Sequence, residues 1–117
     1  MEVRAQQLGT TIVLDLDGPL TVDAETRPLH ELVRAFAHRH AGTVVLDLGH
    51  VAKIDSCGVG ELVTLYNEVR PSGVALSLVN LEKHQRRLLE LSGLLSVLHV
   101  CDSRQEALAW QGPARTM

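Results

Sequence analysis

The stretch TVVLDLGHVAKIDSCGVGELVTLY, residues 43–66, changes its apolar periodicity along its length, and this change indicates the fold. Residues 43–51 form a nearly continuous run rich in Val and Leu, which is typical of a strand covered on both faces of a sheet. From Val59 to Tyr66 the apolar residues recur at helical spacing instead. The stretch therefore predicts a strand that passes through a polar turn, residues 55–58, into an amphipathic helix, as in α/β proteins.

The same alternation of strands and helices extends toward both ends of the chain. Residues 11–18 alternate between apolar and polar side chains, as in a half-buried strand, and residues 2–7 are predicted to be its hairpin partner. Further strands are predicted over residues 74–80 and 95–101, and further helices from Leu29 to Gly42, over residues 81–93, and from Asp102 or Ser103 through Trp110. These elements predict one α/β domain over residues 1–112, with a mixed sheet of four to five strands and about four helices, and a flexible tail over residues 113–117.

The composition excludes several classes of protein. The chain has 117 residues with 45% hydrophobic and 21% charged side chains, which is enough for one core and unlike a disordered chain. Its net charge is −3 and it has no long basic run, so direct binding to nucleic acid is not expected. No signal peptide or membrane-spanning segment is visible, and Cys57 and Cys101 form no CxxC pair. We therefore expect a cytoplasmic protein without membrane insertion.

Two enzymatic or ligand-binding interpretations of the turn before the predicted helix are weak. A hydrolase elbow requires Gly-x-Ser-x-Gly, but Ile54 stands two positions before Ser56, and His50 is the only histidine nearby in the sequence. The residues from Gly58 to Gly60 provide only the first two glycines of a dinucleotide-binding fingerprint, and the chain contains no Walker loop. We expect no catalytic residue, no cofactor and no metal, because the histidines form no plausible ligand set.

The third interpretation is a serine that is itself phosphorylated. Ser56 lies where an N-cap is expected, and its hydroxyl can accept a hydrogen bond from an orphan amide of a helix that begins near Gly58. A phosphate there would place about two negative charges at the positive end of the helix dipole. The glycines would let a kinase loop or a partner helix approach closely. From these residues alone, a plain capped helix without phosphorylation fits about equally well.

The chain resembles a known family at this point. Residues 44–66, VVLDLGHVAKIDSCGVGELVTLY, resemble the signature region of the STAS domain, the fold of anti-sigma factor antagonists, in which a V-x-L-D-L strand leads to I-D-S-[ST]-G-[LVI]-G at a helix start. The resemblance continues through SGVALSLVNLEKHQRRLLELSGLLSVLHVCDSRQEAL, residues 72–108, with its closing D-S-x-x-E-A-L helix. It covers nearly the whole chain.

This resemblance implies a non-enzymatic partner switch. In the family, the serine after the aspartate is phosphorylated by an anti-sigma factor serine kinase with a histidine-kinase-like ATPase fold, and a metal-dependent serine phosphatase reverses the reaction. The unphosphorylated domain binds the anti-sigma factor and frees the sigma factor. The resemblance implies Ser56 as the acceptor and a partner-binding surface around it, made of Asp55, Ser56, Cys57, Gly58, Val59 and Gly60, together with Thr21 and Asp23 of the first loop.

Two positions depart from the family pattern, and two alternatives stay open. Cys57 stands where Ser or Thr is usual, and Thr21 takes the place of an acidic residue that Asp23 could supply after a small shift. Cys57 is interpreted as a plain small residue or, less favoured, as a redox sensor. STAS domains also serve as accessory subunits that bind the ATPase of lipid-transporting ABC complexes without phosphorylation. That role is the alternative function. The six histidines are expected to be solvated.

Overall fold

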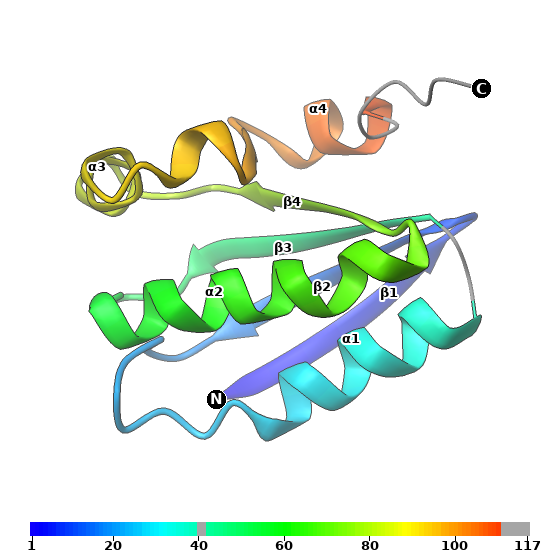
Figure 1. Ribbon diagram of the computed structural model, residues 1–117, viewed down its shortest axis with the longest axis horizontal. Coiled ribbons are helices and arrows are strands. Elements are labelled where there is room, and N and C mark those ends of the chain that lie inside the picture. The colour runs from blue at the N-terminus through cyan, green and yellow to red at the C-terminus, as the bar shows by residue number, and fades with distance from the viewer. Residues whose placement is uncertain (40–41, 111–117) are drawn as a thin grey trace.

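The computed structural model describes residues 1–39 and 42–110, and it shows a mixed sheet with helices on both faces (Figure 1). The strands lie side by side in chain order, and the sheet has five of them. They are β1 (Glu2–Leu8), β2 (Thr11–Asp17), β3 (Thr43–His50), β4 (Ala75–Val79) and β5 (His99–Cys101). β1 pairs antiparallel with β2, and the other neighbours are parallel. The predicted hairpin and the mixed sheet are confirmed.

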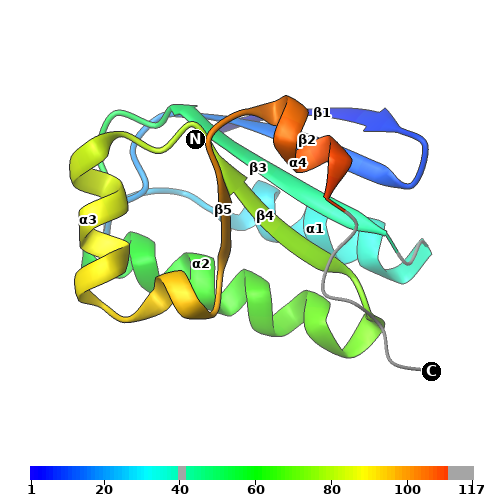
Figure 2. The same cartoon turned by 90° about the horizontal axis from the view of Figure 1, so that it is seen from above.

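Four helices connect or follow these strands. They are α1 (Arg27–Arg39), α2 (Ser56–Val69), α3 (Lys83–Leu91) and α4 (Arg104–Ala109), with the 3₁₀ turns η1 (Arg70–Ser72) and η2 (Leu94–Ser96). Successive parallel strands are joined through α1, α2 and α3, and right-handed crossovers that all step the same way place these helices on one face of the sheet. α4 follows the last strand and packs against β3, β4 and β5 (Figure 2).

The two faces of the sheet have separate cores. Residues 12, 14 and 16 of β2 point into the larger core with α1, α2 and α3, whereas Val13 points to the other face and packs near Ala107 of α4. β3 contributes to both cores, and its first six residues are buried. The expectation that residues 43–51 are covered on both faces is confirmed for β3, because a continuous apolar run leaves no polar face for solvent.

The structure corrects the boundaries of some predicted elements. The strand predicted over residues 95–101 is limited to β5, because η2 occupies Leu94–Ser96 and Gly93 enters it with a left-handed φ of 74°. α2 begins at Ser56, earlier than the predicted start near Gly58. The predicted end of the first helix near Gly42 and the tail over residues 113–117 fall wholly or partly outside the described residues, as does the end of the domain predicted over residues 1–112. Among the described helices, none is long and apolar enough to cross a membrane.

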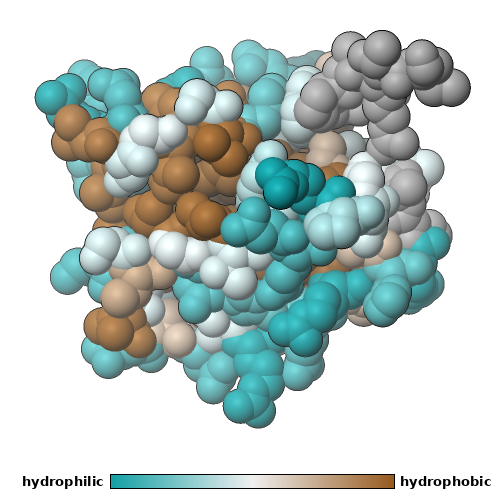
Figure 3. All heavy atoms as spheres, viewed as in Figure 1, coloured by the Kyte–Doolittle hydropathy of each residue, from teal (hydrophilic) through white to brown (hydrophobic). Residues whose placement is uncertain are grey.

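The face that carries α2 also exposes apolar surface. Leu91, at the end of α3, is 72% exposed, and Val97, just after η2, is 46% exposed. Figure 3 shows apolar side chains gathered above α2 on this face.

Candidate functional site

Ser56 is the first residue of α2, and the helix is capped by the residue before it. Asp55 has an extended backbone, with φ −109° and ψ −174°, and its carboxylate accepts a hydrogen bond from the N–H of Gly58 at 2.9 Å. The prediction that Ser56 is the N-cap was therefore wrong, because a carboxylate one residue earlier already reaches the orphan amides. Within the described part of the chain, the Ser56 hydroxyl makes no hydrogen bond, and the residue is exposed.

The loop between β2 and α1 lies directly against the turn that precedes α2. The N–H of Leu20 donates to the carbonyl of Lys53 at 2.8 Å, and the N–H of Asp55 donates to the carbonyl of Leu20 at 3.3 Å. The N–H of Val22 donates to the second carboxylate oxygen of Asp55 at 3.0 Å. Leu20 is also fully buried. These contacts hold the loop in place beside the turn that leads to Ser56.

These backbone donors determine the charge state of Asp55. The hydrogen bonds from Gly58 and then Val22, with further help from Cys57 and Lys53, hold the pKa of Asp55 below its ordinary value of 3.8. A carboxylate that accepts several N–H bonds is stabilised in its charged form. Asp55 therefore adds a fixed negative charge next to the Ser56 hydroxyl at neutral pH.

The two glycines have different structural roles. A Cβ on Gly58 would lie 1.9 Å from the carbonyl oxygen of Leu20, so only glycine fits where α2 approaches the loop. A Cβ on Gly60 would meet nothing within 4 Å, and the residue is exposed. Val59 is 7% exposed and belongs to the larger core. A partner at this turn would therefore find Ser56, Cys57 and Gly60 on the surface, while the side chain of Val59 faces inward.

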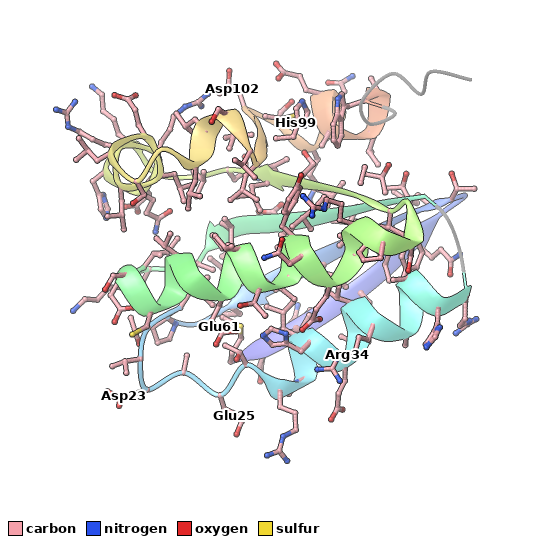
Figure 4. All side chains as sticks on the ribbon, viewed as in Figure 1. Asp23, Glu25, Arg34, Glu61, His99 and Asp102 are labelled. Carbon is pink, nitrogen blue, oxygen red and sulfur yellow. The ribbon has the colours of Figure 1, made fainter. Side chains whose placement is uncertain are left out.

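The structure places the two candidate residues of the first loop differently. Thr21 is half-buried, and its carbonyl accepts from the N–H of Ala24 at 3.0 Å in a turn. Asp23 is exposed at the outer edge of the loop (Figure 4). Among the described residues, neither side chain hydrogen-bonds to Ser56. Val22, between them, is the residue that contacts Asp55, and it was not predicted.

The described residues place no hydrogen-bonded histidine and no cluster of metal ligands at Ser56. No described histidine bonds to its hydroxyl, and His50 is an exposed residue at the end of β3. The described residues contain no group of three or more His, Cys, Asp or Glu side chains arranged to hold a metal ion. Cys57 is exposed and unpaired with another cysteine, whereas Cys101 is buried. The arrangement offers an accessible hydroxyl and thiol without a neighbouring general base.

The prediction that all six histidines are solvated was wrong for His30 and His99. His30 lies between α1 and α2, with Glu61 and Glu68 at its two ring nitrogens. The contact of His30 with these glutamates was difficult to predict from the sequence. The one pattern that links Glu61 with Glu68 is their seven-residue spacing, which puts them on the same face of α2. His99 stacks on Trp110, with ring centroids 3.6 Å apart.

A partly buried polar network on the other face of the sheet was also not predicted. Arg104 of α4 donates from Nε to Asp47 at 2.7 Å and also contacts Asp15. Asn80 donates to both carboxylate oxygens of Asp47 at 3.1 Å. This network ties α4 to the ends of β2, β3 and β4, and it lies apart from Ser56.

The fold and the site together define a small mixed α/β domain with an exposed serine at the start of α2. A loop that is hydrogen-bonded to the turn before α2 lies next to this serine. The chain belongs to the STAS domain family, whose family model matches residues 2–107. The resemblance of residues 44–66 to that family's signature region is thereby confirmed at the level of the family.

Two curated proteins similar to this chain are named for the same role. "Putative anti-sigma factor antagonist BtrV" of Bordetella bronchiseptica is 28% identical over 109 residues, which is 93% of each chain. The anti-sigma F factor antagonist of Paenibacillus polymyxa is 21% identical over 108 residues, which is 92% of each chain.

Solved structures confirm the fold. The anti-sigma factor antagonist SpoIIAA in its unphosphorylated form has a TM-score of 0.70 at 17% identity, covering 92% of this chain and 96% of that one. The phosphorylated form of SpoIIAA from Bacillus has a TM-score of 0.69 at 19% identity, covering 92% and 97%. The murine anion transporter Slc26a9 has a TM-score of 0.74 at 23% identity, covering 91% of this chain but 18% of the transporter.

Proposed function

We propose that this chain is an anti-sigma factor antagonist that is switched by phosphorylation of Ser56. The unphosphorylated domain binds a kinase-type anti-sigma factor in the cytoplasm and releases a sigma factor, and it acts by binding rather than by catalysis. The observation that carries the proposal is the exposed Ser56 hydroxyl at the first position of α2, which makes no hydrogen bond within the described residues. The names of the similar curated proteins support the same role.

The surroundings of Ser56 explain how a phosphate would act. Asp55 already accepts from the N–H of Gly58 at the start of α2 and from the N–H of Val22 in the loop, so a phosphate would add about two negative charges beside an existing one. Asp23, Glu25 and Glu61 lie on the same side of the molecule (Figure 4). A partner surface matched to the unphosphorylated site would then face added bulk and repulsion, and its affinity would fall.

The test uses the full chain and an ATPase-type anti-sigma factor from the same organism. The two are incubated with magnesium and ATP, and the phosphate is mapped by mass spectrometry. We expect phosphate at Ser56, none in Ser56→Ala, and normal modification in Ser92→Ala, a matched exposed serine at the end of α3. A metal-dependent serine phosphatase should remove the phosphate.

Binding provides the second readout. Ser56→Ala should bind the anti-sigma factor as well as the unmodified chain does, whereas Ser56→Glu should bind less tightly. An anti-sigma kinase that modifies another antagonist but leaves Ser56 unmodified, with equal binding of both variants, would overturn the proposal. Binding to an ABC-transporter ATPase in its place would favour the accessory-subunit alternative.

A further inference from the structure

His30 connects α1 to two separate turns of α2. Its side chain is 12% exposed, and its Nδ1 lies 3.1 Å from a carboxylate oxygen of Glu68, while its Nε2 contacts Glu61. Glu61 lies in the second turn of α2 and Glu68 in the fourth. Figure 4 shows Glu61 on the side of α2 turned toward α1. One imidazole therefore bridges most of the length of the α1–α2 contact.

Hydrogen-bond chemistry restricts the state in which this bridge is complete. A carboxylate oxygen only accepts, and a neutral imidazole has one donor nitrogen and one acceptor nitrogen. Both contacts of His30 are hydrogen bonds only when both ring nitrogens carry a proton. When the ring loses one proton, one of the two glutamates faces a lone pair instead of a donor.

The charged groups around His30 determine how much the loss of one of these hydrogen bonds matters. Arg34, one turn along α1, places Nε 3.6 Å from Glu68 Oε2, an oxygen that is buried and has no hydrogen bond in the described part of the chain. From α2 the charged groups are Glu61 and Glu68. From β1, which also packs on α1, the residues on that face are Val3, Ala5 and Gln7, none of which titrates. Two carboxylates thus share His30, and the largely exposed Arg34 pairs with Glu68.

We propose that His30 is a pH-responsive clamp that sets the position of α2. The protonated ring holds α2 against α1 through Glu61 and Glu68, and loss of its proton releases one of these carboxylates. The clamp is complete only while both ring nitrogens carry a proton. α2 begins with Ser56, so the clamp gives the docking surface a second input besides phosphorylation; this consequence rests on the proposed function.

NMR on the full chain labelled with ¹⁵N tests the clamp without any partner. The His30 ring and the backbone amides of α2 are followed between about pH 5 and 8, the range in which histidine changes charge. We expect the amides of Glu61 and Glu68 to titrate with the same midpoint as the His30 ring, and His30→Gln to abolish that titration. The matched control is His84→Gln, because His84 is exposed on α3 and pairs with Glu82. It should leave the α2 titration unchanged.

A conservative second variant keeps the inference falsifiable if His30→Gln does not fold. Glu68→Gln retains the shape of the side chain but removes its charge, so it should lower the pH at which the His30 ring titrates. Amides of α2 that ignore the His30 titration, or a ring midpoint that is the same in Glu68→Gln, would overturn the inference. Absence of phosphate at Ser56 would instead overturn the proposed function and leave the NMR result intact.

Discussion

The backbone N–H of Val22 donates to the Asp55 carboxylate at 3.0 Å, across 33 positions of sequence. The other oxygen of the same carboxylate accepts from Gly58 at 2.9 Å, so one side chain both caps α2 and anchors the loop between β2 and α1. Ser56 directly follows this carboxylate. The geometry of the candidate site therefore depends on Asp55 more than on any interaction of Ser56 itself.

Replacing Asp55 tests helix capping and loop anchoring together. Asp55→Ala removes the acceptors for Val22 and Gly58, and we expect a lower melting temperature and faster hydrogen exchange at both amides. Asp55→Asn keeps one side-chain oxygen, so its melting temperature and exchange rates should lie between those of the wild type and of Asp55→Ala. Because the pKa of Asp55 is lowered, its contribution is present above the unfolded value of about 3.9 and is lost as the pH falls through the folded pKa, so wild type and Asp55→Ala should converge in acid.

The control for this experiment is Asp23→Ala in the same loop. Asp23 is exposed, so its removal should change neither amide. Unchanged exchange at Val22 in Asp55→Ala would show that the loop is held by the backbone contacts of Leu20 with Lys53 and Asp55 alone.

The two glycines of α2 provide a matched pair of substitutions. Gly58→Ala places a methyl group against the carbonyl of Leu20 and should destabilise the domain by about 1–3 kcal/mol, as other overpacking changes do. Gly60→Ala adds a methyl group in open space inside the helix and should stabilise it by roughly 0.5–1 kcal/mol. Chemical denaturation of both variants measures the difference. Equal effects of the two substitutions would contradict the close approach at Gly58.

Much of this fold is encoded in local patterns, and the sequence therefore predicted it. The Val- and Leu-rich run became β3, and the alternation in residues 11–18 became β2 with its hairpin partner β1. η2 was not predicted, because a mostly apolar run such as residues 94–101 is compatible with a 3₁₀ turn as well as with a strand. The turn depends on the left-handed backbone at Gly93, which periodicity does not reveal.

The candidate site was predicted less completely, because its contacts join distant segments. Ser56 and its neighbours were identified from the D-S-x-G-x-G motif, but the choice between Asp55 and Ser56 as cap depends on the residue at which the chain enters helical geometry. The contact of Val22 with Asp55 spans 33 positions, and those of His30 with Glu61 and Glu68 span 31 and 38. No local pattern specifies such pairs.

The network around Asp47 makes a prediction about acid stability. Burial raises the pKa of Asp47, but hydrogen bonds from Arg104, Gly49 and Asn80 outweigh it and leave the pKa below its ordinary value. Arg104→Met removes one of these donors and its charge, and it should destabilise the domain by about 1–3 kcal/mol at neutral pH. Because the pKa of Asp47 should then rise, acid unfolding should begin at a higher pH than in the wild type.

A surface arginine provides the comparison for Arg104→Met. Arg86→Met breaks only an exposed pair with Asp102, at 2.9 Å, and exposed pairs contribute about 0–1 kcal/mol. Thermal and acid denaturation of the two variants should therefore differ clearly. Equal losses would mean that Arg104 contributes no more than a surface ion pair.

Trp110, the only tryptophan of the chain, should report the charge of His99. The two rings stack with centroids 3.6 Å apart and an angle of 11°, and Nδ1 of His99 lies 3.1 Å from the hydroxyl of Ser77. Burial lowers the pKa of His99 below its ordinary value of 6.5, so the ring is neutral at pH 7. On acidification the ring becomes a cation against the indole, and we expect Trp110 emission to change with a midpoint below 6.5.

The stability that the neutral ring contributes is present above about pH 6.5 and is lost as the pH falls through the folded pKa. His99→Asn should remove the fluorescence transition and His84→Gln should keep it, whereas a transition that survives in His99→Asn would assign the change to another group.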